Sequence, residues 1–250
     1  MLFITQPRVG ISHNEILALQ ISAREYGWDV IPADSSWRLD EELIAKKQLG
    51  VPYGSQMFCE IIAQQMNWKL HQNAFDWLAR LPKHYLKRQV DFMSLKEAKN
   101  LHVKKFIKPA DDKCFDAKVY EVGTFKPSDL ISEDYPVLVS EIVKWDLEYR
   151  CFVKNGIVYT WSNYLFFGEV NERKYKYMIP GDDIRPDQFV LNLLNEIGET
   201  PNCVIDIGII HNKGWAVIET NPIWASGIYG CDPYKIIEAM DGSTSFLESK

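Results

Sequence analysis

Two short apolar runs at the start of the chain predict strands, over residues 2–5 and 28–33. Between them apolar residues recur at helical spacing, which predicts a helix. Ser12 and Glu15 have the S-x-x-E spacing of a capping box and predict where this helix begins, and Gly27 predicts its end. A strand, a helix and a second strand in this order indicate a small α/β domain.

Two further helices are predicted over residues 55–66 and 73–81. The second must stop before Pro82, because the residue that precedes a proline is disfavoured in the helical region. No repeat and no low-complexity segment interrupts the chain. We therefore expect a domain boundary near residues 67–84.

Beyond this boundary the apolar residues group mainly into strands. The predicted strands cover residues 85–92, 104–108, 118–122 and 137–143. The predicted helices cover residues 94–101, where Ser94 and Glu97 form another capping box, and residues 186–197 and 234–240. Residues 169–183 are polar and basic without a clear period, which predicts a loop.

Two hairpins complete the predicted elements. The first joins residues 148–154 to residues 157–164 over Asn155-Gly156, a dipeptide that favours a two-residue turn. Its register places Glu148 and Arg150 on one face of the sheet.

The second hairpin, Val204–Asn221, is the stretch around which the chemistry of the chain is organised. With a two-residue turn at Asn212-Lys213, Asp206 lies directly opposite Glu219, and Asn221 shares their face. Opposed side chains have Cβ atoms about 5 Å apart, so two carboxylates there repel and are costly unless a cation lies between them. Mg²⁺ suits this position because it prefers oxygen ligands, usually one or two carboxylates together with substrate phosphates.

Two alternatives to a metal site stay open at this point. Both acids can be solvent-facing residues on the polar side of a hairpin. A three-residue turn would also remove the direct opposition of Asp206 and Glu219.

Composition narrows the class of protein. The chain has 250 residues, 46% of them hydrophobic and 25% charged, as in soluble globular proteins with a sizeable core. Its net charge of −6 does not favour nucleic acid as a partner. No apolar run is long enough to cross a membrane, and the first residues lack the basic region and cleavage site of a secretory signal. The five cysteines are isolated, which argues against a zinc site or a disulfide framework, and we expect a cytoplasmic protein.

Three basic residues are candidates for binding phosphate. Arg88, Lys108 and Lys113 lie on predicted strands or in a loop beside one, and phosphate is bound by Arg through its planar fork and by Lys as a compact charge. Lys108 closes the apolar strand that ends in Phe106-Ile-Lys-Pro109, so we expect it at the end of a sheet. Each of these residues can instead be a solvated surface charge.

Two glutamates flank the bend at residues 142–145. Glu141 and Glu148 can accept hydrogen bonds from an adenine amino group or from ribose hydroxyls. Alternatively, Glu148 only pairs with Arg150.

The order of these residues resembles the ATP-grasp superfamily, and more narrowly its clade named for a signature arginine and two lysines, which bacteria and their phages carry. The wider resemblance rests on Lys-Pro at a strand end, Ser140-Glu-Ile-Val143, Glu148-x-Arg150, Asp206 and Glu219-x-Asn221. The closer one rests on Leu81-Pro82, Tyr85-Leu-Lys-Arg88, Phe106-Ile-Lys-Pro109, Lys113-Cys-Phe115, and Glu219-Thr-Asn221 through Ser226-Gly-Ile-Tyr229. It covers most of the chain from about residue 50 onward.

This resemblance implies an ATP-grasp fold of mixed α+β and α/β class. A small α/β domain over residues 1–75 would precede an ATP-grasp domain over residues 76–250. The two α+β subdomains of the latter, about residues 76–140 and 141–250, would grip ATP between them.

The resemblance also implies site residues. Those that would bind ATP are Arg88, Lys108, Lys113, Glu141, Val143 and Glu148. Lys108 and Lys113 would contact the phosphates, and Arg88 occupies the position at which relatives carry a first lysine. Glu141 and the Val143 backbone would contact adenine. Glu148 would contact the ribose. The residues that would hold Mg²⁺, or Mn²⁺ in its place, are Asp206, Glu219 and Asn221. Lys108 and Arg150 are the expected catalytic residues, because they would neutralise the transferred phosphoryl group.

The superfamily usually joins a carboxylate to an amine or thiol through an acylphosphate. The main hypothesis is therefore an ADP-forming ligase that conjugates an amino acid or peptide. A small-molecule kinase on the same fold and a nucleotide-binding module without turnover are the alternatives. Relatives often carry a substrate-positioning arginine after the first hairpin; residues 159–164 have none, and Arg173 or Arg185 is the candidate replacement. The sequence identifies neither the acid, nor the amine, nor the oligomeric state.

Overall fold

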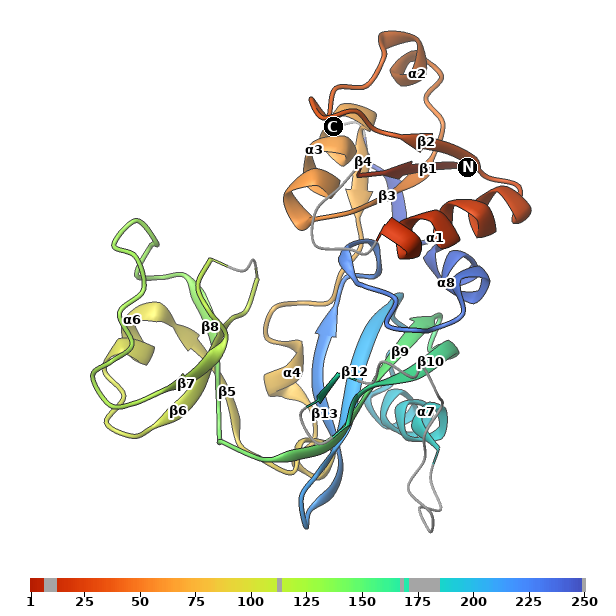
Figure 1. The fold of residues 1–250 in the computed structure, drawn as a ribbon. Coiled ribbons are helices and arrows are strands. Elements are labelled where there is room, and N and C mark those ends of the chain that lie inside the picture. Colours follow the sequence, from red (N-terminus) through yellow and green to blue (C-terminus); the bar gives the residue numbers. More distant parts are fainter. Residues whose placement is uncertain (7–12, 112–113, 167–168, 171–184, 249–250) are drawn as a thin grey trace. The chain divides into compact units, whose positions relative to one another are not determined.

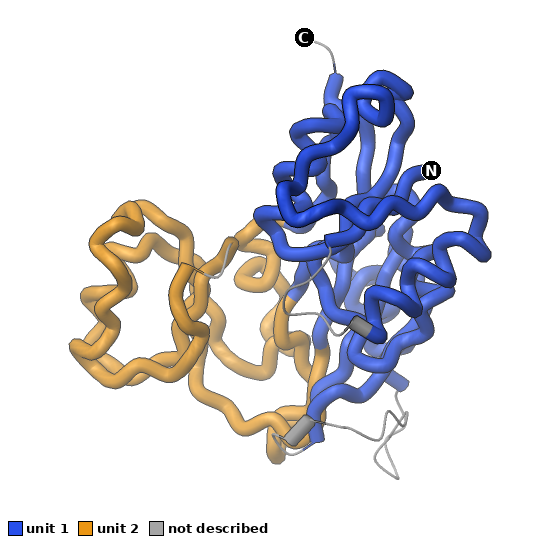
Figure 2. The backbone as a smooth tube through the Cα atoms, turned by 45° about the horizontal axis from the view of Figure 1, so that its top comes forward, with its two compact units in different colours: residues 1–73, 148–206, 220–250 blue, residues 74–147, 207–219 orange. Residues whose placement is uncertain are grey.

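The computed structural model describes residues 1–6, 13–111, 114–166, 169–170 and 185–248. The chain divides into two compact units (Figure 2). Unit 1 comprises residues 1–73, 148–206 and 220–250, and unit 2 comprises residues 74–147 and 207–219. Each unit is therefore assembled from segments that are distant in the sequence.

The N-terminal part of unit 1 has the predicted strand–helix–strand order (Figure 1). A parallel sheet of order β2-β1-β3 places β1 (Leu2–Thr5) between β2 (Asp29–Pro32) and β3 (Gly50–Tyr53). Helix α1 (His13–Glu25) connects β1 to β2, and Gly27 follows its end with a left-handed φ of 89°. Ser12 of the predicted capping box lies outside the described residues.

The other predicted helix of this region begins where its cap predicts. Helix α3 (Gln56–Met66) starts after Ser55, whose hydroxyl accepts the Phe58 N–H. Four short elements here were not predicted by the hydrophobic pattern, because each has too few residues to show a period. They are α2 (Glu41–Ala45), β3, β4 (Trp68–Leu70) and, at the other end of the chain, β14 (Thr244–Phe246), which pairs with β4.

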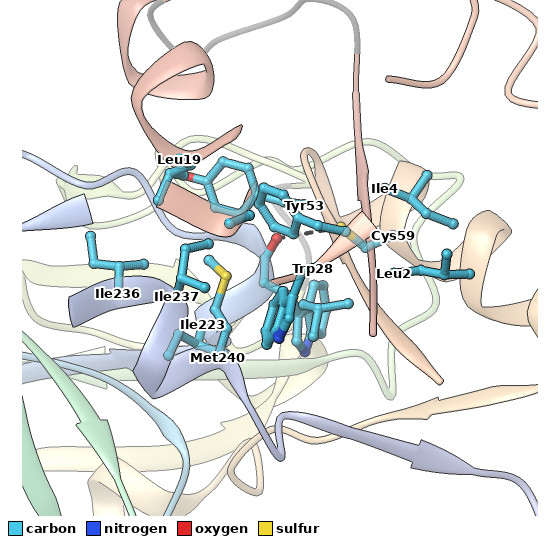
Figure 3. Close-up of a cluster of buried hydrophobic side chains, with 14 of the residues drawn as sticks. Leu2, Ile4, Leu19, Trp28, Tyr53, Cys59, Ile223, Ile236, Ile237 and Met240 are labelled. Atoms are coloured by element: carbon cyan, nitrogen blue, oxygen red, sulfur yellow. Dashed lines mark hydrogen bonds between the residues drawn. The ribbon is translucent and has the colours of Figure 1, made fainter. Parts of the chain in front are cut away.

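The core of unit 1 joins the first strands to the end of the chain. Figure 3 shows Leu2 and Ile4 of β1 in one cluster with Ile236, Ile237 and Met240. The last three belong to helix α8 (Pro233–Met240), which follows the short 3₁₀ helix η1 (Ile223–Ala225). Burial of this many large apolar side chains stabilises the two ends of the chain as one unit.

Unit 2 contains an antiparallel sheet of order β5-β8-β6-β7. Its strands are β5 (Val90–Ser94), β6 (Lys105–Pro109), β7 (Lys118–Tyr120) and β8 (Pro136–Ser140). Helix α6 (Leu95–Lys99) begins with the predicted capping box of Ser94 and Glu97. One face of the sheet packs with α6 in a core that includes Leu95, Ile107 and Val137.

A five-stranded sheet has the order β11-β10-β9-β12-β13, with β13 at its edge. Its strands are β9 (Trp145–Lys154), β10 (Ile157–Phe166), β11 (Glu169–Val170), β12 (Cys203–Ile210) and β13 (Gly214–Asn221). Helix α7 (Pro186–Ile197) has the predicted bounds. Asn155 and Gly156 have φ of 51° and 76°, so the first hairpin has the predicted two-residue turn with both residues left-handed.

The second hairpin differs from the prediction in its turn. The strands leave three residues, 211–213, between them rather than two, and the Lys213 N–H donates to the Ile210 carbonyl over 2.9 Å. His211 belongs to the turn and not to β12, because its N–H donates to the Lys144 carbonyl and its Nδ1 lies 2.9 Å from a carboxylate oxygen of Asp146. The direct opposition of Asp206 and Glu219 therefore no longer follows from the turn length.

Two other predicted elements differ from the structure, and a third is described only at its start. Residues 85–92 do not form one strand: α5 (Lys83–Leu86) follows Pro82, and the left-handed Lys87, with φ of 52°, ends this helix before β5. Of the helix predicted over residues 73–81, only α4 (Trp77–Arg80) forms. The predicted loop at residues 169–183 begins with β11, which pairs with Leu165 and Phe166, while residues 171–184 lie outside the described residues. Among the described helices, none is long and apolar enough to span a membrane.

Candidate functional site

Lys108 lies at the end of a row of paired residues that crosses the unit 2 sheet and is otherwise apolar. It pairs with Leu138 of β8, which in turn pairs with Phe92 of β5. Directly paired residues project from the same face of an antiparallel sheet. Leu138 is buried and Phe92 is exposed, so the ammonium group of Lys108 stands at the end of a row of apolar side chains.

The ammonium of Lys108 forms an ion pair with the carboxylate of Glu219 on β13. The two side chains are 20% and 28% exposed, so both charges keep partial contact with solvent. The pair brings together two residues that are 111 positions apart in the sequence and that were predicted separately, one for phosphate and one for metal.

Arg88 is in a different environment. Its side chain is buried, and its Nη1 donates to the carbonyls of Leu86 and Val217, while Nη2 donates to that of Ile218 over 3.0 Å. Its guanidinium carbon lies 5.0 Å from the centroid of the Trp145 ring. Burial lowers the pKa of Arg88 to about 10, although the charge of Glu219 acts in the opposite direction.

The residues predicted to contact adenine lie where β8 ends. The Glu141 carboxylate accepts the Gln89 N–H over 2.9 Å, and the Glu141 N–H donates to the Gln89 carbonyl over 3.1 Å. Val143 is half-buried in the connection between β8 and β9. Lys113, the second predicted lysine, lies outside the described residues.

Unit 1 holds a buried ion pair of Arg150 and Asp206. Nε and Nη2 of Arg150 donate to the two carboxylate oxygens of Asp206 over 2.9 and 2.7 Å, and Nη1 donates to the Gly227 carbonyl over 2.9 Å. The side chains are 8% and 0% exposed. Asn221 also donates to Asp206, from its Nδ2 over 3.2 Å. This bidentate arrangement is the geometry in which arginine binds a carboxylate most strongly.

Glu148 belongs to the same unit, together with two tyrosines. The hydroxyl of Tyr164 donates to the Glu148 carboxylate over 2.7 Å. The rings of Tyr164 and Tyr229 stack with centroids 5.0 Å apart, and the Arg150 guanidinium carbon lies 4.5 Å from the Tyr229 centroid. The predicted first hairpin has Glu148 on one strand and Tyr164 on the other, so their proximity could be expected. No sequence signal located Tyr229 beside Arg150, because the two residues are far apart in the sequence.

Four of the described cysteines, all buried, are poorly suited to act as nucleophiles. Burial raises the pKa of the thiols of Cys203 and Cys231 to about 12, and it also raises the pKa of the Cys59 and Cys151 thiols. A thiolate is the reactive form of cysteine, so covalent catalysis by these residues is disfavoured.

Comparison with known proteins assigns the family. The model of an ATP-grasp domain, the second family of the clade named for one arginine and two lysines, matches residues 85–239. The chain belongs to this ATP-grasp family. A search of curated proteins found no match.

Two solved structures show the same fold as this ATP-grasp chain. The RimK domain protein ATP-grasp from Sphaerobacter thermophilus is 11% identical, with a TM-score of 0.52 over 94% of this chain and 97% of that one. The ATP-grasp ligase PsnB, solved with a minimal precursor, is 11% identical, with a TM-score of 0.50 over 97% of this chain and 98% of that one. The predicted family and fold are confirmed, and both support the expectation of an ATP-grasp ligase.

The predicted metal ligands of this ATP-grasp protein carry oxygen donors, which Mg²⁺ prefers. Asp206 and Asn221 supply a carboxylate and an amide in unit 1, and Glu219 supplies a carboxylate in unit 2. A carboxylate has about four lone-pair sites, so Asp206 can accept from Arg150 and still offer oxygen lone pairs to a metal. Within the described ranges there is no group of three or more His, Cys, Asp or Glu side chains that could hold a metal on its own. Substrate phosphates and water would therefore complete the coordination.

Arg185, one of the two predicted replacements for a substrate-positioning arginine, pairs with a residue outside the candidate site. Arg185 precedes α7 and pairs with Asp187 over 2.7 Å, with its side chain 62% exposed. Arg173 lies outside the described residues. Arg150, by contrast, pairs with the predicted metal ligand Asp206.

Proposed function

We propose that this ATP-grasp protein is an ATP-dependent, ADP-forming ligase that joins the carboxylate of an amino acid or peptide to an amine or thiol. The ion pair of Lys108 and Glu219 is the observation that carries the proposal. It joins a candidate phosphate-binding cation and a candidate metal ligand at the end of an apolar row, in a chain whose family and fold are those of ATP-grasp proteins.

The proposed nucleotide contacts follow from this arrangement. Lys108 and Lys113 bind the phosphates as point charges. The exposed ring of Phe92, in the row that ends at Lys108, provides a surface on which a flat base can lie. Glu141 and the Val143 backbone form hydrogen bonds with the edge of this base. Glu148, which Tyr164 orients, binds the ribose hydroxyls. GTP is expected to bind less well than ATP, because guanine presents a different edge.

Asp206, Glu219 and Asn221 are the proposed ligands of Mg²⁺, with Mn²⁺ as an alternative ion. When bound, the ion supplies positive charge to the phosphate oxygens. Lys108 and Arg150 are the proposed catalytic side chains, since they add positive charge where negative charge develops on the transferred group.

The proposed reaction has two steps. An oxygen of the substrate carboxylate attacks the γ-phosphorus of ATP, the bond to the bridging oxygen breaks, and ADP leaves. The resulting acylphosphate is a good acyl donor, whereas a free carboxylate has a poor leaving group. The amine or thiol then attacks the acyl carbon and loses its proton, and inorganic phosphate leaves. We propose a peptide or amino-acid substrate by analogy with PsnB, which was solved with a minimal precursor.

Isotope transfer tests this sequence of steps. Peptide and amino-acid pools labelled with ¹⁸O in their carboxylates are incubated with Mg·ATP, and the products are analysed by mass spectrometry. The proposal expects ADP, and phosphate that carries ¹⁸O from the carboxylate only when an acid and an acceptor are both present. AMP and pyrophosphate as main products would contradict the proposal. ADP together with a stable phosphorylated product would show that the protein is a kinase. In a separate calorimetric measurement, the absence of binding heat at millimolar Mg·ATP would exclude a nucleotide-dependent function.

A further inference from the structure

Arg88 contacts the backbone of β13 immediately before Glu219. Its guanidinium binds the carbonyls of two consecutive residues, Val217 and Ile218, over 2.7 and 3.0 Å. A third bond goes to the carbonyl of Leu86, two residues before Arg88 in its own segment. Three N–H donors of this one side chain are thus directed at backbone oxygens of unit 2.

The two consecutive bonds are unusual for a regular strand. In an antiparallel ladder, neighbouring residues direct their carbonyl groups to opposite sides of the strand. Carbonyls 217 and 218 nevertheless both accept hydrogen bonds from one guanidinium. Because β13 is an edge strand, a carbonyl directed away from β12 needs a partner from elsewhere.

We infer that Arg88 is a positioning residue for Glu219 and not a phosphate ligand; this inference rests on the proposed role of Glu219 in metal binding. Arg88 fixes the backbone of Val217 and Ile218, the next residue is Glu219, and the Glu219 carboxylate reaches Lys108. The arginine therefore acts on the site through the main chain. It sets where the carboxylate lies.

Arginine suits this task better than lysine. The planar fork presents several donors in a fixed geometry, so it can hold two carbonyls at once, whereas an ammonium is a single point charge. The ring of Trp145 lies 5.0 Å from the guanidinium carbon and packs against it. Three donors of Arg88 bind neutral backbone carbonyls, and these bonds fix the guanidinium against β13.

The test separates nucleotide affinity from metal affinity. Arg88→Lys and Arg88→Met are compared with Lys108→Met, and Arg80→Met serves as the matched control because Arg80 pairs with Asp76 on an exposed helix surface of the same unit. ADP binding in EDTA is measured by calorimetry, and Mn²⁺ binding to the nucleotide complex by electron paramagnetic resonance. We expect both Arg88 variants to keep metal-free ADP affinity and to lose about 10- to 100-fold in Mn²⁺ affinity, as is typical when a residue that orients a metal ligand is changed. Lys108→Met loses ADP affinity, and Arg80→Met changes neither quantity.

A measurement on the unmodified protein covers the case in which the variants do not fold. With ¹⁵N-labelled arginine, the Nη protons of Arg88 are expected to exchange slowly in the free protein and to keep their chemical shifts when ADP is added. A loss of metal-free ADP affinity equal to that of Lys108→Met, or Nη shifts that move with ADP, would overturn the inference and make Arg88 a phosphate ligand. Unchanged Mn²⁺ affinity in both variants would overturn it as well. If the wild-type protein binds no nucleotide, the proposed function fails, while the free-protein exchange data still decide whether Arg88 holds β13.

Discussion

Two ion pairs, Arg150–Asp206 in unit 1 and Lys108–Glu219 in unit 2, both join a cation to a proposed metal ligand, but they differ in burial and in geometry. The arginine pair is bidentate, with side chains 8% and 0% exposed. The lysine pair joins a single ammonium to a carboxylate, and the two side chains are 20% and 28% exposed. The same combination of charges therefore occurs once in the protein interior and once near solvent.

This difference indicates which pair can exchange partners. Separating a buried pair leaves a charge without its counter-charge in a region of low dielectric constant, which costs several kcal/mol. Separating a partly exposed pair costs about 1 kcal/mol or less, since water solvates both ends. We infer that Arg150 stays on Asp206, whereas Lys108 can move from Glu219 to a phosphate when a nucleotide and a metal arrive.

The largest effect is expected from breaking the buried pair. Asp206→Asn removes the counter-charge of Arg150, and we expect a loss of about 3–5 kcal/mol of unfolding free energy in urea denaturation. The double variant Asp206→Leu/Arg150→Met is the control, because replacing both charges with apolar side chains should recover most of the loss. An Asp206→Asn protein as stable as the wild type would show that Arg150 does not depend on this carboxylate.

Glu219→Gln should separate stability from activity. Loss of the partly exposed pair is expected to change the unfolding free energy by about 1 kcal/mol or less. Without the second proposed carboxylate ligand, Mg²⁺-dependent turnover should fall by about 100-fold or more. Losses of about 10- to 100-fold are typical when a residue that only hydrogen-bonds to a metal ligand is changed, and loss of a ligand itself should cost at least as much. Glu121→Gln is the matched control, since Glu121 pairs with Lys104 on the surface of the same unit. Asn221→Ala should have a milder effect, because it removes a neutral ligand.

A Glu219→Gln protein that unfolds more easily and keeps full activity would show that this glutamate is structural. The sequence alone suggested that neutralising it would relieve repulsion from Asp206. In the structure each acid has a cation of its own, so the expected change in stability is a small loss rather than a gain.

A smaller effect is expected for Lys108→Met, which should weaken ATP binding roughly 10- to 100-fold, the equivalent of one charged hydrogen bond, while the fold stays intact. Lys104→Met is the control: Lys104 lies just before β6 and pairs with the exposed Glu121. Isothermal calorimetry measures both variants. Equal losses would mean that the position of Lys108 at the end of the apolar row has no special role.

Local signals explain which parts of the fold were predictable. Helix α7 has its predicted bounds because Pro186 favours the first helical turn and Gly198 the left-handed position after the last. The Asn155-Gly156 turn could also be predicted from local sequence, since both residues tolerate positive φ. The turn at residues 211–213 was not predictable, because the bonds from His211 to Lys144 and Asp146 depend on a segment about 65 positions away.

The site shows the same limit. The spacing of Asp206, Glu219 and Asn221 located the acids from the sequence, but their cations are set by tertiary structure: Arg150 lies 56 positions from Asp206. The resemblance placed Arg88 with the phosphate ligands, because a sequence shows the charge of a side chain and not its burial. Its three backbone carbonyl partners became visible only in the fold.

The smallest expected effect sharpens the comparison between the two pairs. Double-mutant cycles on Lys108 and Glu219, and on Arg150 and Asp206, give a coupling energy for each pair at low and at high salt. Mobile ions screen charges that solvent reaches, and the Debye length shortens from about 10 Å at 0.1 M salt to about 3 Å at 1 M. The lysine coupling, about 1 kcal/mol or less at low salt, should therefore shrink in 1 M salt. The arginine coupling should change little, because no solvent reaches Asp206. Equal salt sensitivity of the two couplings would mean that the pairs do not differ in their access to water, and the inference that only Lys108 changes partners would lose its basis.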